Sequence, residues 1–423
     1  MHSSIVAGVI VGAGWMAVVA AQQPTFESRV DLIAVDAQVV DRTGHPIDAL
    51  APEHFDVALD GRRRRVVSAE FLRYEPGGAT GRESLLPSRP MADGPTAALH
   101  VDTGRIFIIA VDASSFEVGA ARAPLEAAQA FVSALPPQDF VGLYTYPEGP
   151  RVVPGRDRVS VRQGLAQVPG ARVPFAGIYN LRPSEVVDIL AMSGARPTGG
   201  LAGRALAALG AAVAEIDPVA AVQQRECPDD GECASRIVSE ARAMALHLES
   251  QANRSLGGLN HLLTVMANLP GRKTVVFITG GVVVSDRPGG RPDVGELATV
   301  MGQRAARSNT SVYTVHVDGA FSSTYAASGR RTGEPERARD RGMTGDWLDR
   351  FSAAAGGARL HVPVGAGEFA FERVLRESAG VYLLGVEPAE ADRDGRPRQL
   401  RVRLTRSAPD DATVRHRQWV VVE

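Results

Sequence analysis

The sequence lacks the motifs of the common hydrolase, protease and nucleotide-binding sites. It contains no Gly-x-Ser-x-Gly elbow, no His-Glu-x-x-His pair and no Gly-x-x-x-x-Gly-Lys phosphate loop. Its nine histidines are scattered singly, with His45 and His54 in turn-like stretches and His316 in an apolar stretch typical of a packed core residue. Because no candidate nucleophile is accompanied by a base, we expect that the protein is not an enzyme.

An excess of one charge sign is also missing. The 46 Lys plus Arg residues balance 48 Asp plus Glu residues, so bulk charge does not attract nucleic acid or an anionic membrane. A local exception is the run Arg62–Arg65, which follows an Asp60-Gly61 turn. We interpret this run as the solvated edge of a hairpin, and a nucleic-acid or lipid patch is the alternative.

Long hydrophobic runs are absent apart from Ile5–Ala21, which ends in small residues that offer a cleavage site before Gln22. The run predicts a signal peptide over residues 1–21 and export to the periplasm, the cell envelope or the exterior. No Lys or Arg precedes it, so a retained membrane anchor and a cytosolic chain stay as alternatives. Beyond Ala21 no segment approaches the roughly 18 apolar residues of a membrane-spanning helix.

Cysteine is scarce, with only Cys227 and Cys233 in the chain. They flank a Pro-Asp-Asp-Gly turn, which allows a disulfide to close a small loop in an oxidising compartment. Free thiols are the alternative. A zinc site would need two further ligands, and His247 and His261 are remote in sequence and isolated.

Strand-like alternation marks both ends of the chain. Residues 24–75 predict a small β unit, in which alternation runs through Val30, Leu32 and Ala34 and then through Phe55, Val57 and Leu59. Residues 76–104 are rich in Gly, Pro, Ser and Ala and predict a linker. Residues 381–423 predict a second β segment. Small isolated sheets are marginally stable, so we expect the two β parts to pair, with Val57 close to Val402.

Residues 105–380 alternate strands and helices, which predicts an α/β domain with a doubly wound, mostly parallel six-stranded sheet. An insertion of about residues 170–268 interrupts this domain. We expect the insertion to be irregular up to residue 196 and helical near 200–216 and 234–268, on either side of the cysteine loop. Other helices are expected near 120–134, 159–168 and 368–378 and within 294–307 and 344–355. The predicted strands are Arg105–Asp112, Asp139–Tyr146, Arg151–Val153, Lys273–Thr279, Ser311–Val317 and Arg359–Val362.

Several segments in this order resemble the von Willebrand factor A domain, and more narrowly the exported von Willebrand-A-related proteins of Acidobacteria. The N-terminal unit carries VDLIAVDAQVVDRTGHPIDALAPEHFDVALDG. The middle carries IIAVDASS, LPPQDFVGLYTY and LPGRKTVVFITGG, and the end carries AAAGG and YLLGVEPA. Each motif is weak alone, but their order and spacing make the resemblance specific. Together the segments cover most of the chain after residue 21. The resemblance implies a Rossmann-like sheet flanked by β segments.

The resemblance also implies a ligand site at the carboxyl end of the sheet. Such A domains often hold Mg²⁺ or Mn²⁺ through an Asp-x-Ser-x-Ser loop, a Thr from a second loop and an Asp from a third, because hard cations prefer oxygen. Here Phe116 replaces the second serine and Gly280 replaces the Asp. The oxygens at this end belong to Asp112, Ser114, Ser115, Thr198, Thr279 and Asp318.

With two expected ligands absent, we expect no cofactor and interpret the site as degenerate. Asp112 would then accept hydrogen bonds from the backbone of its own loop. Mg²⁺ or Mn²⁺ at Asp112 and Ser114 is the alternative. The resemblance and the export signal predict a non-enzymatic protein that binds a protein partner, for adhesion or scaffolding at the cell envelope. An assembly factor that recognises partners through its terminal β segments is the second hypothesis.

Overall fold

The computed structural model describes residues 32–74, 105–194, 217–294, 296–318, 334–362, 365 and 367–422, which belong to one unit that begins at Leu32. The predicted signal segment 1–21, the linker 76–104 and the helix expected near 200–216 lie outside these residues. No helix in the described part of the chain is both long enough and apolar enough to cross a membrane.

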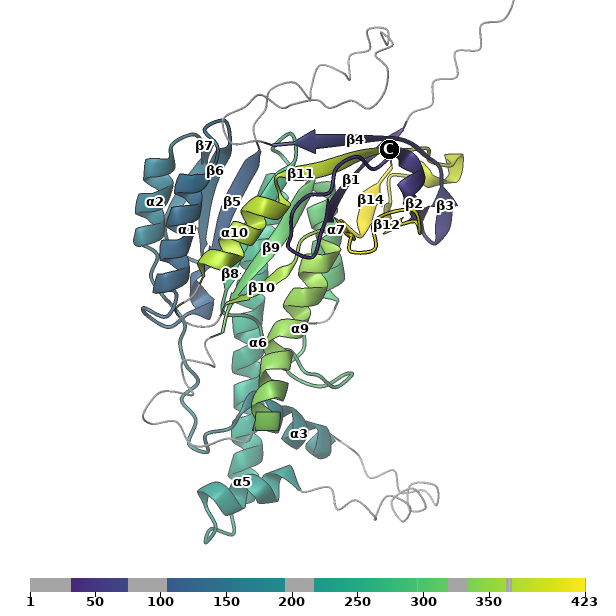
Figure 1. The fold of residues 1–423 in the computed structure, drawn as a ribbon. Coiled ribbons are helices and arrows are strands. Elements are labelled where there is room, and N and C mark those ends of the chain that lie inside the picture. The colour runs from purple at the N-terminus through teal and green to yellow at the C-terminus, as the bar shows by residue number, and fades with distance from the viewer. Residues whose placement is uncertain are drawn as a thin grey trace, which may run out of the picture. The chain divides into compact units, whose positions relative to one another are not determined.

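A six-stranded sheet in the order β10-β9-β8-β5-β6-β7 lies at the centre of the fold (Figure 1). Neighbouring strands are parallel except for the edge strand β7, which runs antiparallel to β6. The predicted fold class, a mostly parallel six-stranded α/β sheet, is therefore confirmed. The strands are β5 (Ile106–Asp112), β6 (Phe140–Tyr146), β7 (Arg151–Gly155), β8 (Lys273–Thr279), β9 (Thr310–Val317) and β10 (Arg359–Val362).

Helices cover both faces of this sheet. Successive side chains of a strand point to opposite sides, so strands that are apolar throughout present apolar side chains on both faces. On β5, Phe107 and Ile109 face one core, which α1 (Arg122–Ala134), α2 (Arg158–Ala166) and α10 (Glu368–Glu377) complete. Ile108 and Ala110 face the opposite core. That core is completed by α6 (Cys233–Met266), α7 (Leu297–Arg307) and α9 (Glu334–Ala354). The sheet is doubly wound, as predicted.

The two β parts of the chain form one sandwich of two four-stranded sheets, ordered β13-β1-β11-β4 and β14-β12-β2-β3. Val57 pairs directly with Val402, which confirms the expected association. The strands are β1 (Ile33–Val40), β2 (Phe55–Leu59), β3 (Arg62–Arg64), β4 (Val66–Arg73), β11 (Gly380–Val386), β12 (Pro397–Leu404), β13 (Thr413–His416) and β14 (Trp419–Val421), with short 3-10 turns at Pro52–His54 and Glu390–Asp392.

Two local features of the sandwich refine the sequence interpretation. Asp60 and Gly61 both have positive φ, 48° and 79°, which suits the tight hairpin between β2 and β3. In β1 the core residues are Val35, Ala37 and Val39, so the part of the predicted alternation that the structure describes, Leu32 and Ala34, falls on the opposite face. A shift of one residue moves every side chain to the other side of a strand.

The insertion contains more helix than predicted. The expectation of an irregular stretch up to residue 196 is wrong from Pro183 onward, where α3 (Pro183–Gly194) begins, and α5 (Pro218–Glu226) was also missed. Val186 and Ile189 of α3 are buried in one core with Ile237 of α6. A short helix that is apolar on one side gains most of its stability from such packing. Likewise, α9 begins at Glu334, before the predicted start near Thr344.

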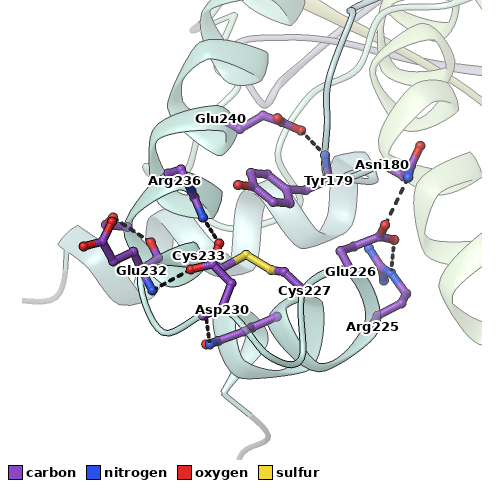
Figure 2. The surroundings of a disulfide bond; sticks show 12 residues. Tyr179, Asn180, Arg225, Glu226, Cys227, Asp230, Glu232, Cys233, Arg236 and Glu240 are labelled. Atoms are coloured by element: carbon purple, nitrogen blue, oxygen red, sulfur yellow. Dashed lines mark hydrogen bonds and ion pairs between the residues drawn. A yellow bond between two sulfur atoms is a disulfide. The ribbon is translucent and has the colours of Figure 1, made fainter.

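A disulfide joins Cys227, at the end of α5, to Cys233, the first residue of α6 (Figure 2). Their Cα atoms are 6.5 Å apart. In the chain-entropy account, closing so short a loop contributes about 2 kcal/mol to stability. Around it, the Glu240 carboxylate accepts hydrogen bonds from the backbone N–H groups of Ile178 and Tyr179, at 2.8 and 2.9 Å. These contacts fasten the chain segment before α3 to α6.

Candidate functional site at the carboxyl end of the sheet

Asp112 ends β5 and is fully buried. Its Oδ1 accepts a hydrogen bond from the Ser114 hydroxyl at 2.6 Å. Its Oδ2 accepts one from Ser255 of α6 at 2.5 Å and one from Thr279 of β8 at 3.3 Å. The sequence predicted that the backbone of its own loop would satisfy this carboxylate. The Ser114 backbone does contribute a hydrogen bond, but hydroxyl donors from three elements serve the carboxylate as well, two of them outside that loop.

Burial is the main influence on the Asp112 carboxyl and raises its pKa. The hydroxyls of Ser114, Ser255 and Thr279 oppose this shift, because each stabilises the charged form. The neighbouring Tyr146 is also buried, and burial together with the Asp112 charge raises the pKa of its hydroxyl well above the usual value. The centre of the site is thus removed from water.

Ser115 joins the loop after β5 to the end of β8. Its hydroxyl donates to the backbone carbonyl of Asp112 at 2.7 Å and accepts from the Gly280 N–H at 2.8 Å. The Gly281 N–H donates to the Thr279 hydroxyl at 3.1 Å. Three predicted hydroxyl residues, Ser114, Ser115 and Thr279, therefore lie with Asp112 in one hydrogen-bonded network.

The two positions where the sequence departs from the metal-binding pattern have structural roles. Phe116 is 3% exposed and belongs to the core on the α1 side of the sheet. At Gly280 an added Cβ would lie 2.5 Å from the carbonyl oxygen of Ser115, so an aspartate does not fit this backbone. No group of three or more His, Cys, Asp or Glu residues in the described ranges could hold a metal ion. One carboxylate with both oxygens hydrogen-bonded does not match the oxygen cage of Mg²⁺.

The two remaining candidates are Asp318 and Thr198. Asp318, which follows β9, pairs with His361 of β10 at 3.1 Å. His316 is buried beside them, and burial, reinforced by the Arg359 charge, lowers its pKa to about 4. It is a core histidine, as predicted. Thr198 lies outside the described residues.

Ser255 is the site residue that sequence reasoning missed. It lies within the buried stripe of α6, next to Leu256 and between Ala252 and Leu259. A serine in an apolar stripe of a helix is a polar group that needs a buried partner. That pattern was the available signal, but only the fold identifies Asp112 as the partner.

Two exposed segments adjoin the network. The N–H groups of Ala171 and Arg172 donate to the carbonyls of Ala113 and Phe116, both at 2.8 Å, and hold residues 171–173 against the loop after β5. Val118 on that loop is 89% exposed and Val173 is 65% exposed. This end of the sheet therefore has a polar, closed centre and apolar side chains on adjoining segments.

Comparisons with known proteins add little to this description. No family model matches the sequence, and no curated protein matches it. Among solved structures, a mutated aerotolerance-related membrane protein from Bacteroides fragilis NCTC 9343 is similar at 12% identity and a TM-score of 0.28, covering 65% of this chain and 98% of that one. A TM-score this low carries no weight. The strand order and the single antiparallel edge strand fit a von Willebrand-A-like fold.

Proposed function

We propose that this protein is a non-enzymatic binding protein that recognises another protein through the carboxyl end of its central sheet, without a metal ion. The observation that carries this proposal is the pair of segments beside the Asp112 network, which present Val118 and Val173 to solvent. Exposed apolar side chains on adjoining, hydrogen-bonded segments suit a protein contact.

Export to the cell envelope or exterior is part of the proposal. The apolar run Ile5–Ala21 supports it. The disulfide between Cys227 and Cys233 also supports it, because such bonds persist in oxidising compartments.

The partner surface can be tested by crosslinking the full chain to its partners in the native organism and identifying them by mass spectrometry. The double variant Val118→Asp/Val173→Asp is expected to lose at least one partner that the unmodified chain captures. The control, Val153→Asp/Val159→Asp, changes two exposed valines on β7 and α2, 82% and 61% exposed, and should capture the same partners. Identical capture by both variants would contradict a contact at this end of the sheet.

Metal independence has a separate test. Calorimetric titration of the protein with Mg²⁺ or Mn²⁺ is expected to show no site tighter than about millimolar, because one hydrogen-bonded carboxylate is a poor cage for a hard cation. A micromolar site that disappears in Asp112→Ala would overturn the metal-free part of the proposal and leave the contact surface to be judged by the capture experiment.

A further inference from the structure

The outer face of the sheet β14-β12-β2-β3 carries arginines from two distant parts of the chain. Side chains alternate along each strand, and Val57, Leu59, Leu400 and Val402 point into the sandwich core. The intervening residues therefore point outward. They include Arg401 and Arg403 of β12 and Arg63 of β3, all exposed. We name these three residues the arginine face.

Strand pairing arranges these arginines in rows. Arg401, Ala58 and Arg63 are directly opposite one another across three strands, and Arg403 is opposite Asp56. Neighbouring strands are about 4.8 Å apart, so Arg401 and Arg63 stand about 10 Å apart on either side of a small alanine. Ala58 is only 4% exposed despite facing outward, which indicates that the arginine stems cover it.

The positive charge of this face is largely uncompensated. Asp56 is the one carboxylate in these rows, and it is already paired with Arg63 at 3.0 Å. Within the described residues, no ion pair involves Arg401 or Arg403. Arg62 and Arg65 are exposed nearby and add to the charge, although the whole chain has a net charge of −2. The face is therefore a local excess of guanidinium groups.

The run Arg62–Arg65 alone does not define this face. Arg64 faces the other way and binds the buried Asp392 with two hydrogen bonds, at 2.6 and 2.8 Å. This corrects the interpretation of the whole run as a solvated edge. The fold takes Arg64 out of the surface and adds Arg401 and Arg403 to it.

We propose that the arginine face docks an extended acidic segment of a partner protein. Guanidinium groups bind carboxylates with paired hydrogen bonds. Arg401 and Arg403 are two residues apart on one strand, about 6.7 Å, which is also the spacing of alternate side chains in an extended peptide. The negative charge of Asp56 among these arginines disfavours a phosphate polymer, whose negative charge is denser than that of an acidic peptide. This surface is separate from the carboxyl end of the central sheet. A negative result for the arginine face would therefore not contradict the proposed contact at the carboxyl end of the sheet, and the reverse also holds.

Fluorescence anisotropy with a labelled peptide that alternates glutamate and serine tests the proposal at low ionic strength. Arg401→Gln/Arg403→Gln in the full chain is expected to weaken binding about tenfold. The control Arg162→Gln/Arg242→Gln removes two exposed arginines from α2 and α6 and changes the net charge equally. It should bind like the unmodified chain. Circular dichroism checks that both variants fold.

Three results would overturn the proposal. The first is absence of peptide binding by the unmodified chain. The second is an equal loss in the control variant, because bulk charge would then explain the binding. The third is preference, through Arg401 and Arg403, for polyphosphate or phosphatidylglycerol vesicles over the peptide at equal charge concentration. That preference would assign the face to a phosphate polymer or a membrane.

Discussion

Replacing Asp112 with alanine is expected to lower the free energy of unfolding by about 3 kcal/mol. The substitution removes the acceptor for the hydroxyls of Ser114, Ser255 and Thr279. A buried polar group that loses its partner typically costs 1–3 kcal/mol, and alanine also leaves a small cavity. Urea unfolding of the full chain, followed by circular dichroism, measures this loss.

Asp112→Asn is the matched control. Asparagine keeps the size and one acceptor oxygen, and the surrounding hydroxyls can rotate to accept from its amide. We expect it to lose less than half of what alanine loses. Unfolding of Asp112→Ala at the same urea concentration as the unmodified chain would show that the network does not hold the loop.

The pH dependence of the asparagine variant gives a second readout. Burial raises the pKa of Asp112 above its usual 3.8 in the folded chain. The folded state then binds the proton more tightly than the unfolded state. This stabilisation is present below the unfolded pKa and is lost as the pH rises through the folded one. The unmodified chain should therefore lose stability relative to Asp112→Asn as the pH rises from about 4 to neutrality.

Stability is expected to rise between pH 8 and pH 10 because of Lys273, the only lysine in the sequence. Lys273 begins β8 and is 2% exposed, and its ammonium donates to the Leu269 carbonyl at 2.6 Å. Burial, with a smaller effect of the Arg417 charge, lowers its pKa from 10.5 to about 8. Arg417 itself pairs with Asp36 at 3.2 Å, and Asp36 also pairs with Arg272 at 3.7 Å.

The direction follows from proton binding in the two states. Below pH 8 both states carry the charge, and the folded state bears the cost of a buried ammonium. Between the folded pKa of about 8 and the unfolded pKa of about 10.5, only the unfolded state stays protonated. The free energy of unfolding then gains up to about 3 kcal/mol, since each pKa unit corresponds to about 1.4 kcal/mol.

Lys273→Met is the comparison that isolates this residue. The variant should be more stable than the unmodified chain at pH 7, because methionine has a similar volume and no charge to bury. The difference should shrink by about 2 kcal/mol as the pH rises from 7.5 to 10. Tyrosine ionisation in the unfolded state affects both proteins alike. Parallel stability curves for the two proteins would contradict a lowered pKa at Lys273.

Much of the fold could be predicted because its elements have strong local patterns. The apolar run Ile106–Val111 marks a strand buried on both faces, and the structure buries every one of these residues except Ile106, which is half-buried. Short helices were harder to predict from the sequence. Pro183–Gly194 and Pro218–Glu226 depend on packing against α6, which a local pattern does not display.

The candidate site was predictable only in part. Asp112, Ser114, Ser115 and Thr279 come from two motifs at strand ends, and parallel strands bring such ends to one edge of a sheet. Asp318 lies at a neighbouring strand end but pairs with His361. Its partner depends on the register between β9 and β10, which no motif encodes.

By itself, the sequence determined the strands, the α/β alternation and the two departures at Phe116 and Gly280, because these are properties of residues close together in the chain. Tertiary structure alone decided that Ser255 donates to Asp112, that Arg64 turns inward to Asp392, and that Arg401 and Arg403 share a surface with Arg63. Each of these depends on contacts between segments far apart in sequence. Such contacts are selected by packing and strand register over the whole fold, and no local pattern specifies them.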